Sequence, residues 1–147
     1  MGNNKFSETA FYSGIGATDW SWSPLWLDFD NDGNKDLFIS NGIPKRLNDI
    51  DYINYVSNDE IQMKIKMNGA GNRDLGMIDK FPQIKIPNKF FKNNGKLLFA
   101  DMKASIGNSQ STYSNGSIYA DLDNDGDLDL VVNNIDAPAL IYENKSN

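Results

Sequence analysis

The chain has 147 residues, a length that suits one domain with a buried core. Its 20 acidic and 14 basic residues give a net charge of −6, which argues against nucleic acid as a partner, because phosphate binding needs a basic surface. Histidine and cysteine are absent, which excludes disulfides and removes the commonest general base and the usual ligands of catalytic zinc. No apolar run approaches the roughly 20 residues of a membrane helix, so we expect no membrane span.

The first elements expected along the chain are short strands separated by turn residues. Residues 6–10 are expected to form a strand before a glycine-containing turn, and residues 22–29 a strand that leads into an acidic loop. Residues 36–40 leave that loop as an apolar run of strand length. For Trp20, Trp22 and Trp26 we expect a packing role between neighbouring sheets rather than a platform for sugar rings.

The acidic loop, residues 28–36 (the first loop), has the pattern D-x-D-x-D-G-x-x-D. Ca²⁺ takes about 6–8 oxygen ligands, which short aspartate side chains on a tightly turning loop can supply. Glycine at the sixth position allows the sharp turn. A plain turn needs only about two or three Asp, Asn or Gly residues, whereas carboxylates packed this closely repel one another unless a cation neutralises them. The pattern therefore predicts a calcium loop.

The next segment has no counterpart elsewhere in the chain. Residues 42–87 look like an insertion, and part of it is predicted to be helical. Asn48 could cap one helix, and Ser57 with Glu60 has the spacing of a capping box for another. The second helix would carry Ile61 and Ile65 on one apolar face before glycines near residue 70 end it.

The pattern of strands and acidic loop then returns. Residues 89–92 are predicted to form a strand that ends in a hairpin turn at residues 93–95. Residues 121–129 (the second loop) again read D-x-D-x-D-G-x-x-D. The remaining predicted strands are residues 97–102, 117–122, 129–133 and 139–143.

A constant offset of 93 residues relates the two loops and their flanks, so that Ser21, for example, corresponds to Ser114. The offset predicts an internal duplication, with repeats near residues 6–41 and 99–134. An EF-hand is excluded, because it needs a bidentate glutamate at position 12 and flanking helices. Position 12 is Ile39 in the first loop and Val132 in the second, and both lie in apolar strand-like runs.

Two calcium sites are predicted, each bound by the side chains at loop positions 1, 3, 5 and 9 and by the backbone carbonyl at position 7. The predicted ligands are Asp28, Asp30, Asp32, Asn34 and Asp36 in the first loop, and Asp121, Asp123, Asp125, Asp127 and Asp129 in the second. The side chain of Asp127 is expected to face solvent. We predict no catalytic residues and no organic cofactor.

These motifs resemble the FG-GAP or VCBS repeat of integrin-α-like β-propellers, in the form found in bacterial proteins with ASPIC-associated repeats. The resemblance rests on the two metal loops with their apolar strands, on the stretch at residues 18–25, and on the turn at residues 91–95 followed by Phe99. It implies an all-β fold of four-stranded antiparallel blades, each with Ca²⁺ in the loop that joins its first two strands. The chain has strand material for about two blades, with the partly helical insertion between them, whereas a closed propeller has about 4–8.

The resemblance also implies an extracellular, cell-surface or periplasmic protein that binds a protein or glycan ligand and is not an enzyme. Its partners would include the remaining blades of a longer chain or other copies of itself. Two alternatives stay open at the level of sequence. The chain could be a module of a secreted polysaccharide-active enzyme, since glycosidases need only two carboxylates. It could also be a purely structural part of a larger propeller.

Overall fold

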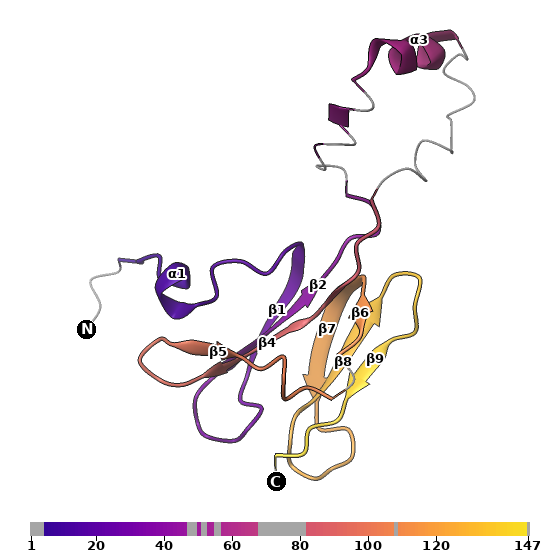
Figure 1. Ribbon diagram of the computed structural model, residues 1–147. Helices are drawn as coiled ribbons and strands as arrows, with labels where there is room; N and C mark the ends of the chain where they lie inside the picture. The colour runs from indigo at the N-terminus through magenta and orange to yellow at the C-terminus, as the bar shows by residue number, and fades with distance from the viewer. Residues whose placement is uncertain are drawn as a thin grey trace. The chain divides into compact units, whose positions relative to one another are not determined.

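The computed structural model describes residues 5–46, 50, 53–54, 57–67, 82–107 and 109–146. The chain divides into two compact units. The first unit contains Met1–Gly42 together with Ile86–Asn147, and the second contains Ile43–Lys85. The first unit carries both acidic loops (Figure 1).

The first unit is built from three antiparallel sheets. In the four-stranded sheet the order is β1 (Ser21–Leu27), β2 (Asp36–Asn41), β4 (Lys89–Asn93), β5 (Phe99–Asp101). In the three-stranded sheet it is β7 (Ser114–Ala120), β8 (Asp129–Asn134), β9 (Leu140–Tyr142). A short pair joins β3 (Ile86–Pro87) to β6 (Ser111–Thr112). The prediction of an all-β antiparallel fold is confirmed in its coarser form: the described residues are mostly antiparallel sheet, with four strands in one large sheet and three in the other rather than four in both.

The two larger sheets begin in the same way. Leu27 lies opposite Asp36 where the first loop leaves β1, and Ala120 lies opposite Asp129 at the equivalent place beside the second loop. A shift of register interrupts the pairing near the start of both first strands. The 93-residue offset read from the sequence therefore holds for the strand pairing as well.

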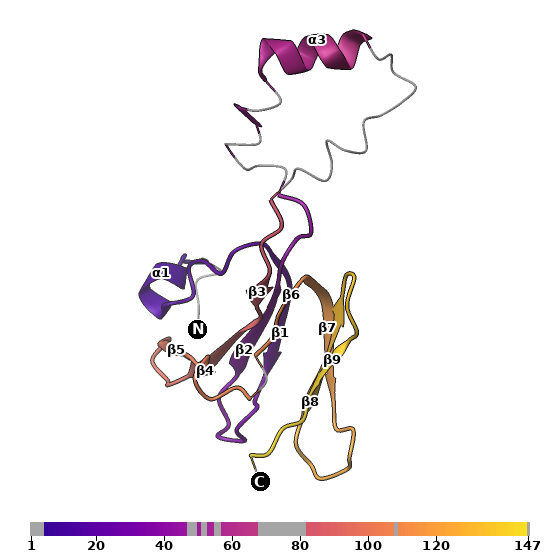
Figure 2. The same cartoon turned by 45° about the vertical axis from the view of Figure 1, so that its right-hand side comes forward.

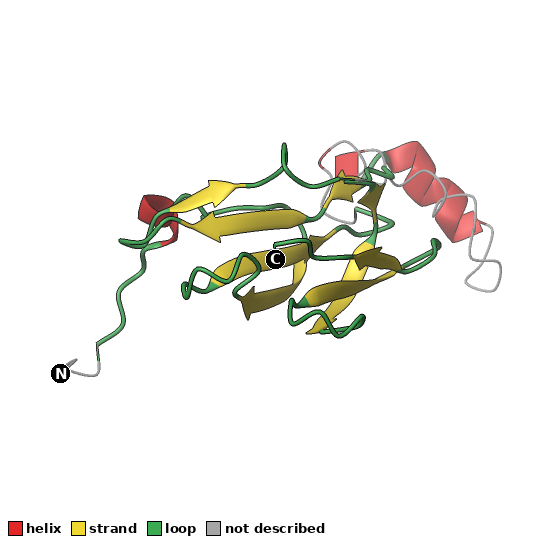
Figure 3. Cartoon of the chain, turned by 90° about the horizontal axis from the view of Figure 1, so that it is seen from below, coloured by secondary structure: helices red, strands yellow, loops and turns green. Residues whose placement is uncertain are grey.

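The core of the unit lies between the two larger sheets. Leu27, Phe38 and Phe90 of the four-stranded sheet cluster with Leu130 and Val132 of the three-stranded sheet. The rings of Phe38 and Phe90 meet edge to face with centroids 4.8 Å apart, an arrangement that aromatic pairs favour. This shared core places the two acidic loops at the same end of the unit, as Figures 1 and 2 show, and Figure 3 views the sheets from that end.

The outward face of the four-stranded sheet is largely buried, whereas that of the three-stranded sheet is largely exposed. On the four-stranded sheet, Leu37, Ile39 and Phe91 are buried beneath Ile15 and Phe99, so that β2 is buried on both faces. On the three-stranded sheet, three neighbouring side chains form a row across the strands, which we call the open face. These side chains are Ile118, which is 64% exposed, half-buried Val131, and Ile141, which is 67% exposed.

The prediction of a strand at residues 6–10 is wrong. Residues 5–9 have no regular structure, and a short helix, α1 (Ala10–Ser13), follows them. Gly14 ends this helix with a left-handed backbone, at a φ of 76°, which glycine adopts without strain. A strand needs a neighbouring strand for its backbone hydrogen bonds. Among the described residues no strand pairs with residues 5–9, and the side chain of Phe6 is exposed.

In the second unit the described helix is α3 (Asp59–Met67). Its first turn is capped by Asn58, whose side-chain oxygen accepts the N–H of Glu60 at 2.9 Å, rather than by the predicted Ser57. The predicted cap Asn48 and the glycines near residue 70 lie outside the described residues. None of the described helices combines the length and apolar character needed to cross a membrane.

Candidate metal centres

Both acidic loops fold through the same backbone conformation. Asn31 and Gly33 have positive φ angles of 56° and 86°, and Asn124 and Gly126 have 64° and 96°. Asparagine and glycine are the residues that tolerate this left-handed region best. The positive φ angles at the fourth and sixth positions turn the chain back toward the first aspartate of each loop.

The first aspartate of each loop accepts hydrogen bonds from the turn. Asp28 accepts the N–H groups of Asp32 at 3.1 Å and of Gly33 at 2.8 Å. In the second loop, Asp121 accepts the N–H of Gly126 at 3.2 Å. Each loop is therefore closed on itself by the carboxylate of its first aspartate.

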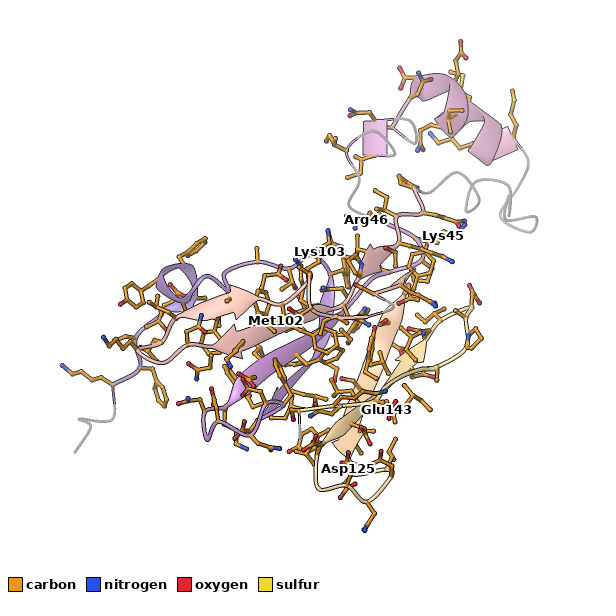
Figure 4. The ribbon with its side chains drawn as sticks, turned by 60° about the horizontal axis from the view of Figure 1, so that its bottom comes forward. Lys45, Arg46, Met102, Lys103, Asp125 and Glu143 are labelled. Atoms are coloured by element: carbon orange, nitrogen blue, oxygen red, sulfur yellow. The ribbon has the colours of Figure 1, made fainter. Side chains whose placement is uncertain are left out.

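Carboxylates gather at both centres. The first group contains Asp28, Asp30 and Asp36, and the second contains Asp121, Asp123 and Asp125. Within each group the candidate ligand atoms lie within 4.8 Å of one another. Figure 4 labels Asp125 in the loop between β7 and β8. Six of the eight predicted side-chain ligands thus come together in two groups that could hold a metal ion.

The ninth position ties each loop to the sheet. Asp36 is fully buried, and its two oxygens accept the N–H of Asn93 at 2.7 Å and of Phe29 at 3.1 Å. Asp129 does the same with Asn144 at 2.8 Å and Leu122 at 2.9 Å. One carboxylate therefore joins the loop to the strand that follows it and to the end of the third strand.

The two closing aspartates differ in their electrostatic surroundings. Burial raises the pKa of Asp36, helped by the neighbouring charges of Asp30 and Asp32. Hydrogen bonds from the N–H groups of Asn144 and Leu122 lower the pKa of Asp129. The pKa of Asp123 is also raised, first by burial and then by the charge of Asp125. A bound cation would relieve the repulsion at both centres.

Asn93 and Asn144 are site residues that the sequence interpretation missed. Beside their N–H bonds to the closing aspartates, their side-chain amides donate to the carbonyls of Lys35 at 3.0 Å and Leu128 at 3.4 Å, the residues that precede those aspartates. Residues 93–95 were predicted only as a hairpin turn, and residue 144 was given no role. An asparagine just after the third apolar strand of each repeat was the available signal.

Asp32 and Asp30 are arranged differently from their counterparts in the second loop. Asp32 accepts the N–H of Asn34 at 2.8 Å, which is the main cause of its lowered pKa. Lys92 forms ion pairs with both aspartates, at 3.6 Å for Asp32. Within the described residues, the Oδ1 atom of Asp30 is buried and has no hydrogen-bond partner, which leaves this oxygen available to a cation.

The expectation for Asp127 is wrong, because its side chain is buried rather than solvent-facing. Its Oδ1 accepts the side-chain amide of Asn31 at 2.7 Å, and its Oδ2 accepts the N–H and hydroxyl of Ser146 at 3.1 and 3.2 Å. The bond from Asn31 joins the first loop to the second. Asn34, at the equivalent position, is exposed. The ligand roles of the two backbone carbonyls stay predictions.

A comparison of the chain with protein-family models, with curated proteins and with solved structures finds no match in any of the three. The conclusions about function therefore rest on the geometry of the two centres and on the way the sheets pack.

Proposed function

We propose that the chain is a calcium-binding segment of a β-propeller of the FG-GAP or VCBS kind, used in extracellular recognition or adhesion. The observation that carries the proposal is the repeated centre: each loop brings three carboxylates together, and its buried ninth-position aspartate accepts one N–H from the loop and one from the end of the third strand. The ligand atoms are all oxygens, which Ca²⁺ prefers, and their loops turn tightly enough to enclose it. Asp28, Asp30 and Asp36 would hold one ion, and Asp121, Asp123 and Asp125 the other.

The role proposed for the metal is structural. In each repeat the loop joins the first two strands of a sheet, and the closing aspartate also accepts the N–H of an asparagine at or just past the end of the third. A cation held by the loop would therefore clamp three segments together. Asn93 and Asn144 would orient the closing carboxylates through their N–H groups.

The packing of the two larger sheets supports a propeller over a closed two-sheet sandwich. Phe38 of the four-stranded sheet packs against Leu130 and Val132 of the three-stranded sheet. By the 93-residue offset, Phe38 corresponds to Val131, and Leu130 and Val132 correspond to Leu37 and Ile39 on the opposite face. The two sheets thus stack head to tail with unlike faces in contact. A head-to-tail contact can repeat, because each sheet added leaves the same kind of face free.

The open face of the three-stranded sheet is where this stack would continue. Its residues Ile118, Val131 and Ile141 occupy the positions that Leu25, Phe38 and Phe90 have in the buried contact. We propose that it is covered by the next blade, which belongs either to a longer chain or to another copy. Light scattering in solution with Ca²⁺ distinguishes the two, because a closed ring of two-bladed copies would have about two to four times the monomer mass.

The test of the metal sites is thermal denaturation with Ca²⁺ and with EDTA. If the sites bind near 10⁻⁴ M, as extracellular modules commonly do, about 10 mM Ca²⁺ should stabilise the fold by about 2.7 kcal/mol per site. Asp125→Ala should lose the contribution of the second loop and change little in EDTA. Equal melting temperatures with and without Ca²⁺ would overturn the proposal. A glycan depolymerisation assay on the same samples separates it from the polysaccharide-active alternative.

A further inference from the structure

The two acidic loops are not equivalent, because one of them already contains a positive charge. The ammonium of Lys92, from the end of β4, pairs with Asp30 and lies 3.6 Å from a carboxylate oxygen of Asp32. Both aspartates belong to the predicted ligand set of the first loop.

The second loop has the opposite charge at the equivalent place. Lys92 directly precedes Asn93, and Glu143 directly precedes Asn144, the two asparagines that bond to the closing aspartates. Glu143 pairs instead with Lys145 at 3.3 Å, and both of these side chains are largely exposed. The second loop also has a fifth aspartate, Asp127, where the first has a neutral asparagine.

The carboxylate groups differ accordingly. In the second loop the aspartates at positions 1, 3 and 5 converge on one centre. In the first loop the fifth-position residue, Asp32, is outside the converging group and faces the ammonium of Lys92 instead. The side chain of Lys92 thus occupies one carboxylate oxygen of Asp30 and one of Asp32, two residues of the predicted ligand set.

We propose, on the basis of the calcium function above, that Lys92 is a built-in counter-cation that weakens Ca²⁺ binding in the first loop, so that the second loop fills first. An ammonium and a divalent ion compete for the same oxygens and repel each other. At a separation of about 4 Å this repulsion is enough for a change in affinity of about tenfold even in bulk water. Lys92 neutralises part of the negative charge of the first loop without metal, whereas in the second loop a metal ion would have to neutralise the carboxylates.

Calorimetric titration of Ca²⁺ into the full chain tests this proposal. The wild type should show two binding steps whose dissociation constants differ by about tenfold or more. Asp125→Ala should remove the tighter step. Lys92→Gln should tighten the weaker step by about tenfold. Lys89→Gln is the matched control, because Lys89 lies on the same strand and pairs at 2.5 Å with Asp101, away from the loops.

The reciprocal variant, Glu143→Lys, places a lysine at the position equivalent to Lys92 and should weaken the tighter step by about tenfold. Two steps of equal affinity, or a Lys92→Gln titration identical to that of Lys89→Gln, would overturn the inference while leaving the calcium sites in place. The absence of Ca²⁺ binding in every variant would instead overturn the proposed function.

Discussion

Replacing Asp127 by alanine would remove the buried carboxylate that joins the two acidic loops. The side chain is fully buried and accepts hydrogen bonds from the amide of Asn31 and from the N–H and hydroxyl of Ser146. Asn31 lies in the first loop and Ser146 lies beyond β9, so three distant parts of the chain depend on one carboxylate. We therefore expect Asp127→Ala to destabilise the fold without any metal being present.

The magnitude follows from the three hydrogen bonds. A typical intramolecular hydrogen bond contributes about 1 kcal/mol net, and bonds to a charged group contribute more. Asn31 and Ser146 are exposed, so water can take over their freed groups, and we use the lower value. Asp127→Ala should then lower the free energy of unfolding by about 3 kcal/mol. For a chain of this size that corresponds to a fall in melting temperature of about 6–12 °C.

The assay is chemical denaturation in EDTA, with Asn34→Ala as the matched control. Asn34 occupies the same loop position in the first repeat but is exposed, so its replacement should cost less than about 0.5 kcal/mol. Asn31→Ala should cost about 1 kcal/mol, and the double variant should show a coupling energy of similar size. Equal and small effects of Asp127→Ala and Asn34→Ala would refute the reasoning, since the bridge between the loops would then be absent.

Three further predictions concern the core, a tight backbone contact and the newly found asparagines, and all are measured by denaturation in EDTA. Phe38→Ala should destabilise the fold by about 3–5 kcal/mol, because the ring is fully buried between the sheets, whereas Phe6→Ala at an exposed position should have no measurable effect. Gly42→Ala should cost more than about 2 kcal/mol, since a Cβ would lie 2.8 Å from a backbone oxygen at a φ of +121°, and Gly116→Ala, with open space around it, should be tolerated. Asn144→Ala should cost about 1–2 kcal/mol, since its amide donates to two backbone carbonyls, and it should also weaken Ca²⁺ binding by the second loop in a calorimetric titration. Wild-type stability of Phe38→Ala, Gly42→Ala or Asn144→Ala would contradict the contact on which that prediction rests.

The acidic loops could be predicted from sequence because most of their interactions are local. Asp28 bonds to residues four and five positions further on, and the left-handed positions are filled by Asn31 and Gly33, which suit that conformation. The strands on either side were predictable for the same reason, since apolar runs of strand length border each loop. The strand predicted at residues 6–10 failed because strand formation depends on a partner that a local pattern does not reveal.

The helix of the second unit illustrates the same limit on a smaller scale. Its existence was predicted, yet its cap is Asn58 rather than Ser57. Both residues are good caps, and a shift of one position lies within the usual uncertainty of helix ends.

By itself, the sequence determined that the chain is a duplicated β protein with two oxygen-rich loops, because the spacing of aspartates, glycine and apolar residues acts over a few neighbouring positions. The tertiary structure alone decided how those loops differ. Lys92 reaches the first loop from a strand about 60 residues away, and buried Asp127 accepts the amide of Asn31, 96 residues earlier. The first contact depends on the pairing of β2 with β4 and the second on the packing of the two sheets, and neither can be read from a local pattern.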